Sequence, residues 1–402
     1  MLSRLRFATW VDAARIRRIS IISIAIAVIA TIALIATSEG ALDVFGRPLG
    51  TDFSSFYSAG QLALEGRPAD AYQPSEQSKI QLALFEADEI PFYVWHYPPL
   101  FLVVAAGLAA LPYAFSWFVW ASVTLVSYIA VVQRLFRKDT VILAAIGFPA
   151  ILINFLHGQN GFLIAALFAG ALLCMRSKPL LAGVLIGLMA FKPQFGVLIP
   201  FALLAGGFYR TFAAATLTVL LTCAATVLLF GEHTWLAFFE STLATRDQVL
   251  ERGGAGWHKM QSLFSAVRMW GGSILVAYIA HAVLIVSVLL ATIWAWRSRI
   301  DYNLKAAILM VGALLASPYI YDYDLVLLAP AALFLIRYSL QNGFAPYEQF
   351  GLAFVWLVPI LARPSALVLF VPLAFLSTLW LFVLLLQKSR LHMRQSQVEA
   401  IA

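Results

Sequence analysis

Long apolar runs recur from one end of this sequence to the other, and they constrain the fold more than any other feature. Many of them approach the roughly 20 residues that a helix needs to cross the hydrocarbon core of a bilayer. Hydrophobic residues make up 62% of the chain, more than an ordinary water-soluble domain contains. The strands of membrane barrels alternate apolar and polar residues, and these runs do not. The sequence therefore predicts an all-α, polytopic membrane protein that forms a single domain over residues 1–402.

Basic residues flank many of the runs and predict their orientation, because short loops rich in Lys and Arg stay in the cytoplasm. Five arginines precede the first run, at residues 19–37, and a basic tail follows the last one. The first run is long enough to span and lacks a clean small-residue cleavage site after it, so we expect a retained helix instead of a signal peptide. The charge rule then predicts a multi-pass protein of the inner (plasma) membrane with about twelve crossings and both termini in the cytoplasm.

Two longer segments, residues 38–97 and 231–270, fall on the external side of the membrane by this count. We expect the first to contain two amphipathic helices in the headgroup region, at about 52–64 and 75–87. The sequence does not decide whether residues 98–133 cross the membrane once or twice, because two full crossings would place the basic sequence RLFRKD outside. A half-length or broken helix in this stretch would resolve the conflict, since protein packed around it can satisfy its backbone.

The charge and the cysteines exclude other classes of protein. The net charge of +7 comes from short basic loops, without the basic stripe and interleaved aromatics that bind nucleic acid. Cys174 and Cys223 both lie in apolar runs, which indicates ordinary buried thiols and neither a disulfide nor a cysteine metal site. We therefore expect no nucleic-acid partner.

Polar and ionisable residues collect on the predicted external side. A charge at the membrane edge is costly unless it is paired or solvated, so such residues are candidates for function. Their convergence on one face predicts a water-accessible cavity that opens to the outside. The candidates are Asp52, His96, Tyr97, His157, Gln159, Asn160, Lys192, Gln194, His258, Asp322 and Asp324.

Each candidate also has a simpler interpretation. Asp52 could cap the helix that follows it, and Lys192 could extend from a helix end toward the headgroups. His157 and Asn160 could satisfy backbone groups in a tight turn, and the aspartates near residue 322 could lie in a hydrated loop. No single residue decides between these alternatives, and the shared side of the membrane favours a site.

Five short motifs follow one another along residues 45–340: DFSSFYSAGQLALEGRPADAYQP, HYPPLF, GQNG, AGVLIGLMAFKPQ and SPYIYDYDLVLLAPA. In this order they resemble glycosyltransferase family 87, the DUF2029-type membrane enzymes of the GT-C class. The best-known members are α-mannosyltransferases that depend on polyprenol-phosphate mannose. The resemblance implies a GT-C fold and an inverting transfer of a sugar, such as the hexose mannose, from a polyprenyl-phosphate donor. It also implies a lipid or glycan acceptor at the extracytoplasmic face.

The resemblance implies roles for particular residues. Asp52 matches the acidic residue that acts as general base in the first external loop, where it takes the proton of the acceptor hydroxyl. Lys192 is the first candidate for the donor phosphate, because an ammonium group pairs well with it. Further donor-site candidates are Gln194, His157, Gln159, Asn160, Tyr321 and Asp322, and the cavity or acceptor-site candidates are Tyr57, His96, Tyr97 and His258. Family members often carry a histidine in the SPYIYDYD turn, where this chain has tyrosines, so the role of that turn stays open.

We expect no metal and no cofactor beyond the donor, because no DxD-like cluster accompanies Asp52 and the Asp322–Tyr–Asp324 spacing is common. The expected partners are membrane lipids, a polyprenyl-phosphate-linked sugar and a glycolipid or glycan acceptor. A transporter or flippase of a lipid-linked sugar is the alternative function, although no convincing internal repeat supports it. An inactive accessory subunit, in which Asp52 only caps a helix, is a third possibility.

Overall fold

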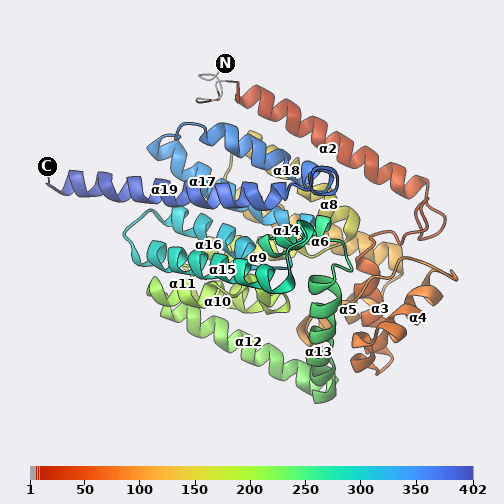
Figure 1. The fold of residues 1–402 in the computed structure, drawn as a ribbon. Helices are drawn as coiled ribbons and strands as arrows, with labels where there is room; N and C mark the ends of the chain where they lie inside the picture. Colours follow the sequence, from red (N-terminus) through yellow and green to blue (C-terminus); the bar gives the residue numbers. More distant parts are fainter. Residues whose placement is uncertain (1–5, 7, 9, 402) are drawn as a thin grey trace.

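The structure, a computed structural model, describes residues 6, 8 and 10–401 and consists of helices joined by turns (Figure 1). Three isolated β-bridges and no strand occur among these residues. The α-helices are α2 (Ala13–Ala36), α3 (Phe53–Leu64), α4 (Pro74–Leu84), α5 (Pro99–Ala109), α6 (Tyr113–Leu135), α7 (Asp139–Ile146), α8 (Pro149–His157), α9 (Gly161–Cys174), α10 (Pro179–Leu188), α11 (Ile199–Ala205), α12 (Tyr209–Phe230), α13 (Glu232–Thr245), α14 (Leu263–Met269), α15 (Ile274–Arg297), α16 (Tyr302–Ala316), α17 (Leu328–Asn342), α18 (Glu348–Leu369) and α19 (Leu373–Ile401). The short 3-10 or π turns are η1 (Pro68–Tyr72), η2 (Met189–Phe191), η3 (Pro193–Phe195), η4 (Arg246–Glu251), η5 (Trp257–Lys259) and η6 (Asp322–Leu327).

Seven helices of the described chain are long and apolar enough to cross a membrane. They are α2, α6, α12, α15, α17 together with η6, α18 and α19. Helices α7 and α8 form a pair bent by 46° and make an eighth span if both halves cross together. Five further apolar segments, which include α5, α9 and α16, are shorter than a full crossing. The predicted all-helical membrane fold is confirmed, whereas the count of about twelve crossings stays a prediction.

Helix α16 lies at the centre of the molecule. Twelve of its residues, from Leu304 to Ala316, are buried, and α15, α17 and α19 pack around it. A helix that is apolar on every side belongs inside a bundle. In contrast, α2, α12 and α15 expose rows of Ile, Leu and Val, such as Leu228 at 87%. These exposed apolar faces are suited to contact with lipid.

The first external segment is packed more deeply than expected. Its two helices begin and end within a few residues of the predicted bounds, but nine residues of α3 are buried beneath α4, α5 and η1. We expected α3 to lie in the headgroup region, and its side chains instead contact protein on nearly every side. The stretch 98–133 contains the eleven-residue α5 followed by the full-length α6.

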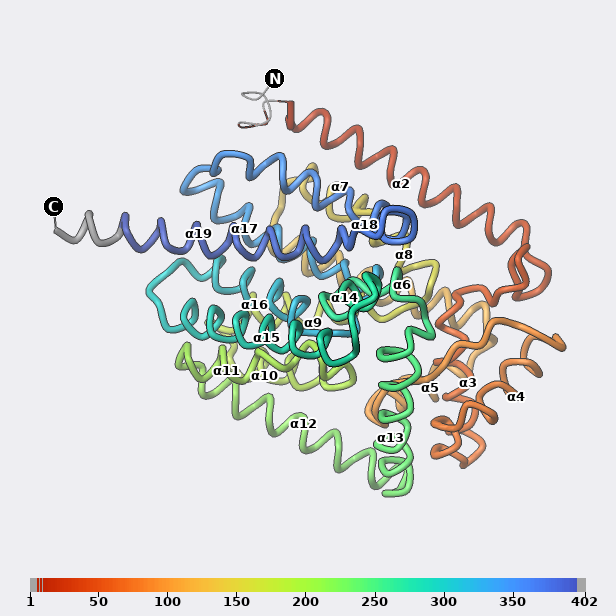
Figure 2. Tube along the Cα trace, in the orientation of Figure 1, coloured from red at the N-terminus to blue at the C-terminus, as the bar shows by residue number. Residues whose placement is uncertain are grey.

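Helices α3, α4 and α13 gather at one end of the helix array, whereas α2 begins and α19 ends toward the other (Figures 1 and 2). Helix α13 runs across the end of α12 instead of continuing its direction (Figure 1). The polar turns after α8, between η2 and η3, and before η6 lie at the α3 end, because they line the same cavities as residues of α3 and α13.

Candidate functional site

Two adjoining cavities open among these turns. The larger cavity has a volume of 590 Å³ and is bordered by Asp52, His157, Lys259 and Arg363, among others. The smaller cavity has a volume of 280 Å³ and is bordered by Lys192 and Asp324, among others. Five residues border both cavities and form a common wall: His96, Tyr97, Val249, Tyr321 and Tyr323.

Asp52 lies at the N-cap position of α3, yet its side chain makes no capping hydrogen bond. The simple helix-cap interpretation of this residue is therefore wrong. The carboxylate is 26% exposed and borders the larger cavity. Thr51, directly before it, has a φ of +31°, which is unusual for a β-branched residue. Backbone strain of this kind is found most often at functional sites.

His157 connects Asp52 to a cation across the larger cavity. Its Nδ1 atom lies 2.7 Å from the Thr51 hydroxyl and 3.6 Å from the Asp52 carboxylate. Its Nε2 atom lies 3.5 Å from the guanidinium of Arg363. Helix α8 ends at His157 because Gly158 adopts the left-handed conformation, and a Cβ atom on Gly158 would lie 2.6 Å from that of Phe53. The glycine therefore permits the close approach of His157 to the start of α3.

The turn that contains Asp322 and Asp324 binds two cations from distant parts of the chain. Asp322 pairs with Arg363 of α18, whose Nη2 atom donates to Oδ1 at 2.8 Å. Asp324 accepts a hydrogen bond of 2.7 Å from the Lys192 ammonium and a second from the backbone N–H of Tyr321. Both carboxylates are buried, so neither lies in a hydrated loop. Lys192 is buried with Asp324 and does not extend toward the headgroups.

The common wall lies between the cavity that Asp52 borders and the cavity that Asp324 borders. Tyr321 and Tyr323 stack with ring centroids 5.4 Å apart. The Tyr97 hydroxyl donates a hydrogen bond of 3.0 Å to Gln159. Burial raises the pKa of Tyr97, and the negative charges of Asp324 and Asp52 raise it further. Its hydroxyl therefore keeps its proton and serves as a hydrogen-bond donor.

In the part of the chain that the structure describes, three cationic side chains but only one carboxylate border the larger cavity. Arg47 pairs with Asp43 at 2.9 Å, and Arg363 pairs with Asp322. Lys259 has no ion-pair partner among the residues that the structure describes. Asp43 and Asp322 do not border the cavity themselves, so the side chains that do border it carry an excess of positive charge, which suits an anionic ligand.

The structure brings most of the predicted residues to these cavities, although their chemical roles stay predictions. The residues that border the larger cavity, the smaller one or both are Asp52, His96, Tyr97, His157, Gln159, Lys192, Gln194 and Tyr321.

Four predicted residues do not border either cavity. Ser55 of α3 borders the larger cavity, whereas Tyr57, two residues later, is turned about 200° around the helix and donates a hydrogen bond of 2.8 Å to the Leu111 carbonyl. Asn160 is fully buried, and Asp322 acts on the larger cavity only through Arg363. His258 does not border the larger cavity, but the next residue, Lys259, does. Burial lowers the pKa of His258, and the positive charges of Lys259 and Arg363 lower it further.

Sequence reasoning missed Arg363, Lys259 and the pairing of Lys192 with Asp324. Arg363 could have been found, because it is a lone arginine between two apolar runs, and the structure places it in α18. Nothing in the sequence distinguishes Lys259 from other residues of the second external segment. The pairing of Lys192 joins residues 132 positions apart and depends on the tertiary fold.

Among the described residues, no group of three or more His, Cys, Asp or Glu side chains is placed to hold a metal ion. Metal-independent chemistry stays a prediction that needs an experiment.

The family model of glycosyltransferase family 87 matches residues 95–318, more than half of the chain. No curated protein and no solved structure matches the sequence. The matched segment includes Lys192 and Lys259, whereas Asp52 and Arg363 lie outside it.

Proposed function

Because the chain belongs to glycosyltransferase family 87 and is thus a membrane glycosyltransferase, we propose that it uses a polyprenyl-phosphate sugar as donor. The acceptor is a hydroxyl group of a lipid or glycan. One observation carries this proposal: the carboxylate of Asp52 borders a cavity that three cationic side chains also border. A base and an anion site in one cavity are what sugar transfer from a phosphate requires.

The reaction needs one proton acceptor. The acceptor oxygen attacks the anomeric carbon while the bond from that carbon to the phosphate oxygen breaks, and the phosphate leaves with the electron pair. Asp52 takes the proton of the acceptor hydroxyl. Attack from the side opposite the leaving group inverts the anomeric configuration. The departing phosphate is stabilised by cations and does not need a general acid.

We assign the donor phosphate to the larger cavity, toward Lys259 and Arg363, instead of to Lys192. Lys192 is buried, and Asp324 at 2.7 Å already balances its charge. Lys259 has no such partner in the described chain, and the guanidinium of Arg363 has five N–H groups, so that it can bind a phosphate beside Asp322. His157 and Thr51 would orient the Asp52 carboxylate.

We further propose that this site faces the outside of the plasma membrane and that both termini are cytoplasmic. The distribution of the basic loops supports this proposal. Residues of α3 and α13 border the cavities, and these helices lie at the end of the array away from the start of α2 and the end of α19 (Figure 1).

The test is the variant Asp52→Asn. We expect it to lose sugar transfer by a factor of about 100 or more, since a positioned general base contributes that much. The assay incubates purified protein with a panel of polyprenyl-phosphate sugars and follows donor consumption, which also identifies the sugar. The reaction is run with a chelator, and a requirement for Mg²⁺ or Mn²⁺ would contradict metal-independent transfer.

Asp88→Asn is the matched control, because Asp88 is an exposed aspartate of the same external segment. It should transfer sugar at the wild-type rate. Full activity of Asp52→Asn would remove the general base from the proposal. A protein that moves the intact lipid-linked sugar across vesicles without consuming it would be a transporter or flippase.

A further inference from the structure

We infer that the smaller cavity is the subsite for a neutral sugar ring, the hydroxyl-bearing end of the acceptor, and that it does not take a phosphate. This assignment rests on the proposed sugar transfer and specifies where one of its two substrates lies.

Charge distinguishes the two cavities. Among the residues that the structure describes, Lys192 and Asp324 are the only Lys, Arg, Asp or Glu side chains that border the smaller cavity, and they neutralise each other at 2.7 Å. A phosphate in this cavity would lie close to the buried carboxylate of Asp324, and the repulsion would offset its attraction to Lys192. The larger cavity offers the anion a better site, because it is bordered by Lys259, which has no ion-pair partner in the described chain, and by the guanidinium of Arg363.

The pair of Lys192 and Asp324 matches the chemistry of sugar hydroxyl groups. The Lys192 ammonium has three N–H donors, and its one hydrogen bond in the described chain goes to Asp324. Each oxygen of the Asp324 carboxylate accepts one hydrogen bond and can accept another. Neighbouring hydroxyl groups can accept from the ammonium and donate to the carboxylate at the same time. Such charge-assisted hydrogen bonds are about twice as strong as neutral ones.

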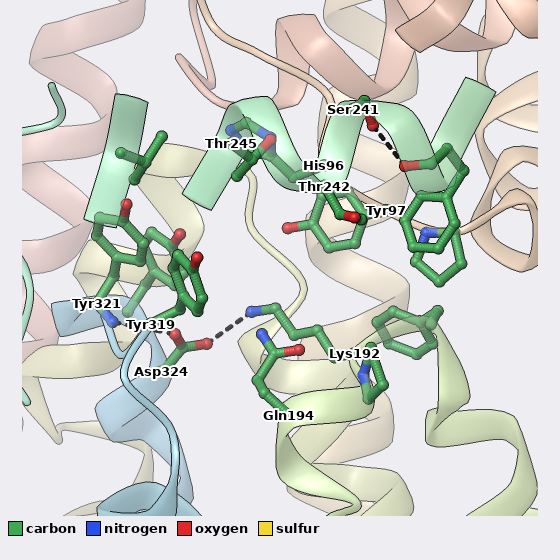
Figure 3. A pocket seen from close by; sticks show the side chains of 16 residues that line it. His96, Tyr97, Lys192, Gln194, Ser241, Thr242, Thr245, Tyr319, Tyr321 and Asp324 are labelled. Carbon is green, nitrogen blue, oxygen red and sulfur yellow. Dashed lines mark hydrogen bonds and ion pairs between the residues drawn. The ribbon is translucent and has the colours of Figure 1, made fainter. Parts of the chain in front are cut away.

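The opposite side of the cavity also carries hydroxyl groups. Figure 3 shows α13, which carries Ser241, Thr242 and Thr245, on the side of the cavity opposite Lys192 and Gln194. The hydroxyls of Ser241 and Thr242 donate to carbonyls within their own helix, so their oxygens stay available as acceptors. A polyol between these two sides would meet donors and acceptors on both.

Aromatic side chains close the remaining sides, and they suit the apolar faces of a sugar ring. Tyr321 and Tyr319 lie at one end of the cavity (Figure 3). The rings of Phe191 and Phe238 also border it. Rigid aromatic rings with polar edges offer both packing area and hydrogen bonds.

Size and position support the same ligand. A volume of 280 Å³ is close to the lower limit, about 300 Å³, of pockets that take small molecules, so the cavity fits a single ring better than a long lipid. Its wall with Tyr97 and Tyr321 is shared with the larger cavity. A hydroxyl that reaches past this wall enters the cavity that Asp52 borders.

The test is the double variant Lys192→Met with Asp324→Leu. Replacing both members of a buried ion pair by apolar residues of similar volume usually preserves the fold, whereas removing one member leaves a buried charge. Binding of methyl glycosides to the purified full-length protein is measured by saturation-transfer NMR, and binding of dodecyl phosphate by calorimetry. We expect methyl glycoside affinity to fall about tenfold or more and dodecyl phosphate affinity to change less than about twofold.

The control is the double variant Lys388→Met with Glu348→Leu, which removes a second buried ion pair of 2.6 Å that borders neither cavity. It should keep both affinities. Unchanged glycoside binding in the Lys192 and Asp324 variant, or a loss of dodecyl phosphate binding, would overturn the subsite and leave the transferase proposal intact. Glycoside binding that depends on the pair, in a wild-type protein that consumes no donor, would support the subsite and overturn the proposed transfer.

Discussion

Asp322 and Asp324 are two residues apart, and each binds a cation from a different element. Removing one member of a buried pair leaves an uncompensated charge and costs about 3–5 kcal/mol of folding free energy. Lys192 and Asp324 are therefore mutually dependent, and a single substitution at either position tests stability more than function. Lys259 lacks such a partner in the described chain, so its substitution reports on ligand binding.

At this residue scale we predict the effect of Lys259→Gln. The variant should bind dodecyl phosphate about tenfold more weakly, because a hydrogen bond to a charged group contributes about 1.5–3 kcal/mol. Its thermal stability should not change, since no ion pair of the described chain is lost. Calorimetric titration of the purified protein measures the affinity.

Lys178→Gln is the control for this substitution. Lys178 is exposed and lies at the start of α10, whereas the Lys192 turn follows the other end of that helix. An equal loss of affinity in both variants would show a general effect of charge and would contradict a specific role for Lys259.

At the scale of elements, the position of Asp52 depends on how α3 packs against α5. The two helices touch at Gly60, where a Cβ atom would lie 2.0 Å from the carbonyl oxygen of Ala105. Backbone atoms cannot yield as the end of a flexible side chain can, so only glycine allows this approach. Small residues at such contacts let membrane helices pack closely.

We therefore predict that Gly60→Ala lowers the free energy of unfolding by about 1–3 kcal/mol, the cost of overpacking a close contact. It should also reduce sugar transfer, because α3 carries Asp52 at its start. Thermal unfolding in detergent and the donor-consumption assay measure the two effects.

Gly107→Ala on α5 is the matched control. A Cβ atom at Gly107 would meet no heavy atom within 4 Å, and alanine favours a helix over glycine. This variant should be as stable as the wild type or slightly more so. Equal destabilisation by both substitutions would contradict the close contact at Gly60.

At the scale of the whole molecule, the orientation in the membrane follows from the loops at the two ends of the array. In a background with Cys174→Ala and Cys223→Ala, a cysteine at Asp88 should react with a membrane-impermeant maleimide on intact cells. A cysteine at Ser177, between Arg176 and Lys178, should react only after permeabilisation. Both positions are exposed, so access to the reagent depends on the side of the membrane. The reverse labelling pattern would invert the proposed topology.

Much of the site could be predicted, because the hydropathy and charge rules act on each segment separately. They predict that Asp52, His157 and Lys192 lie on one side of the membrane, and all three border the two adjoining cavities. They did not show that Ser55 borders the cavity and Tyr57 does not, since the face of α3 that meets the cavity depends on how the helices pack. The same rules could have found Arg363, which is an isolated charge in an otherwise apolar stretch of the sequence.

The sequence by itself determined that this chain forms helices in lipid and gathers its polar turns at one end, because span length, hydropathy and loop charge are local properties. Only the tertiary structure decided which cation meets which carboxylate and that two cavities share one tyrosine wall. These contacts join residues as far apart as Lys192 and Asp324, so they depend on how distant helices pack. No local pattern in the chain encodes that packing.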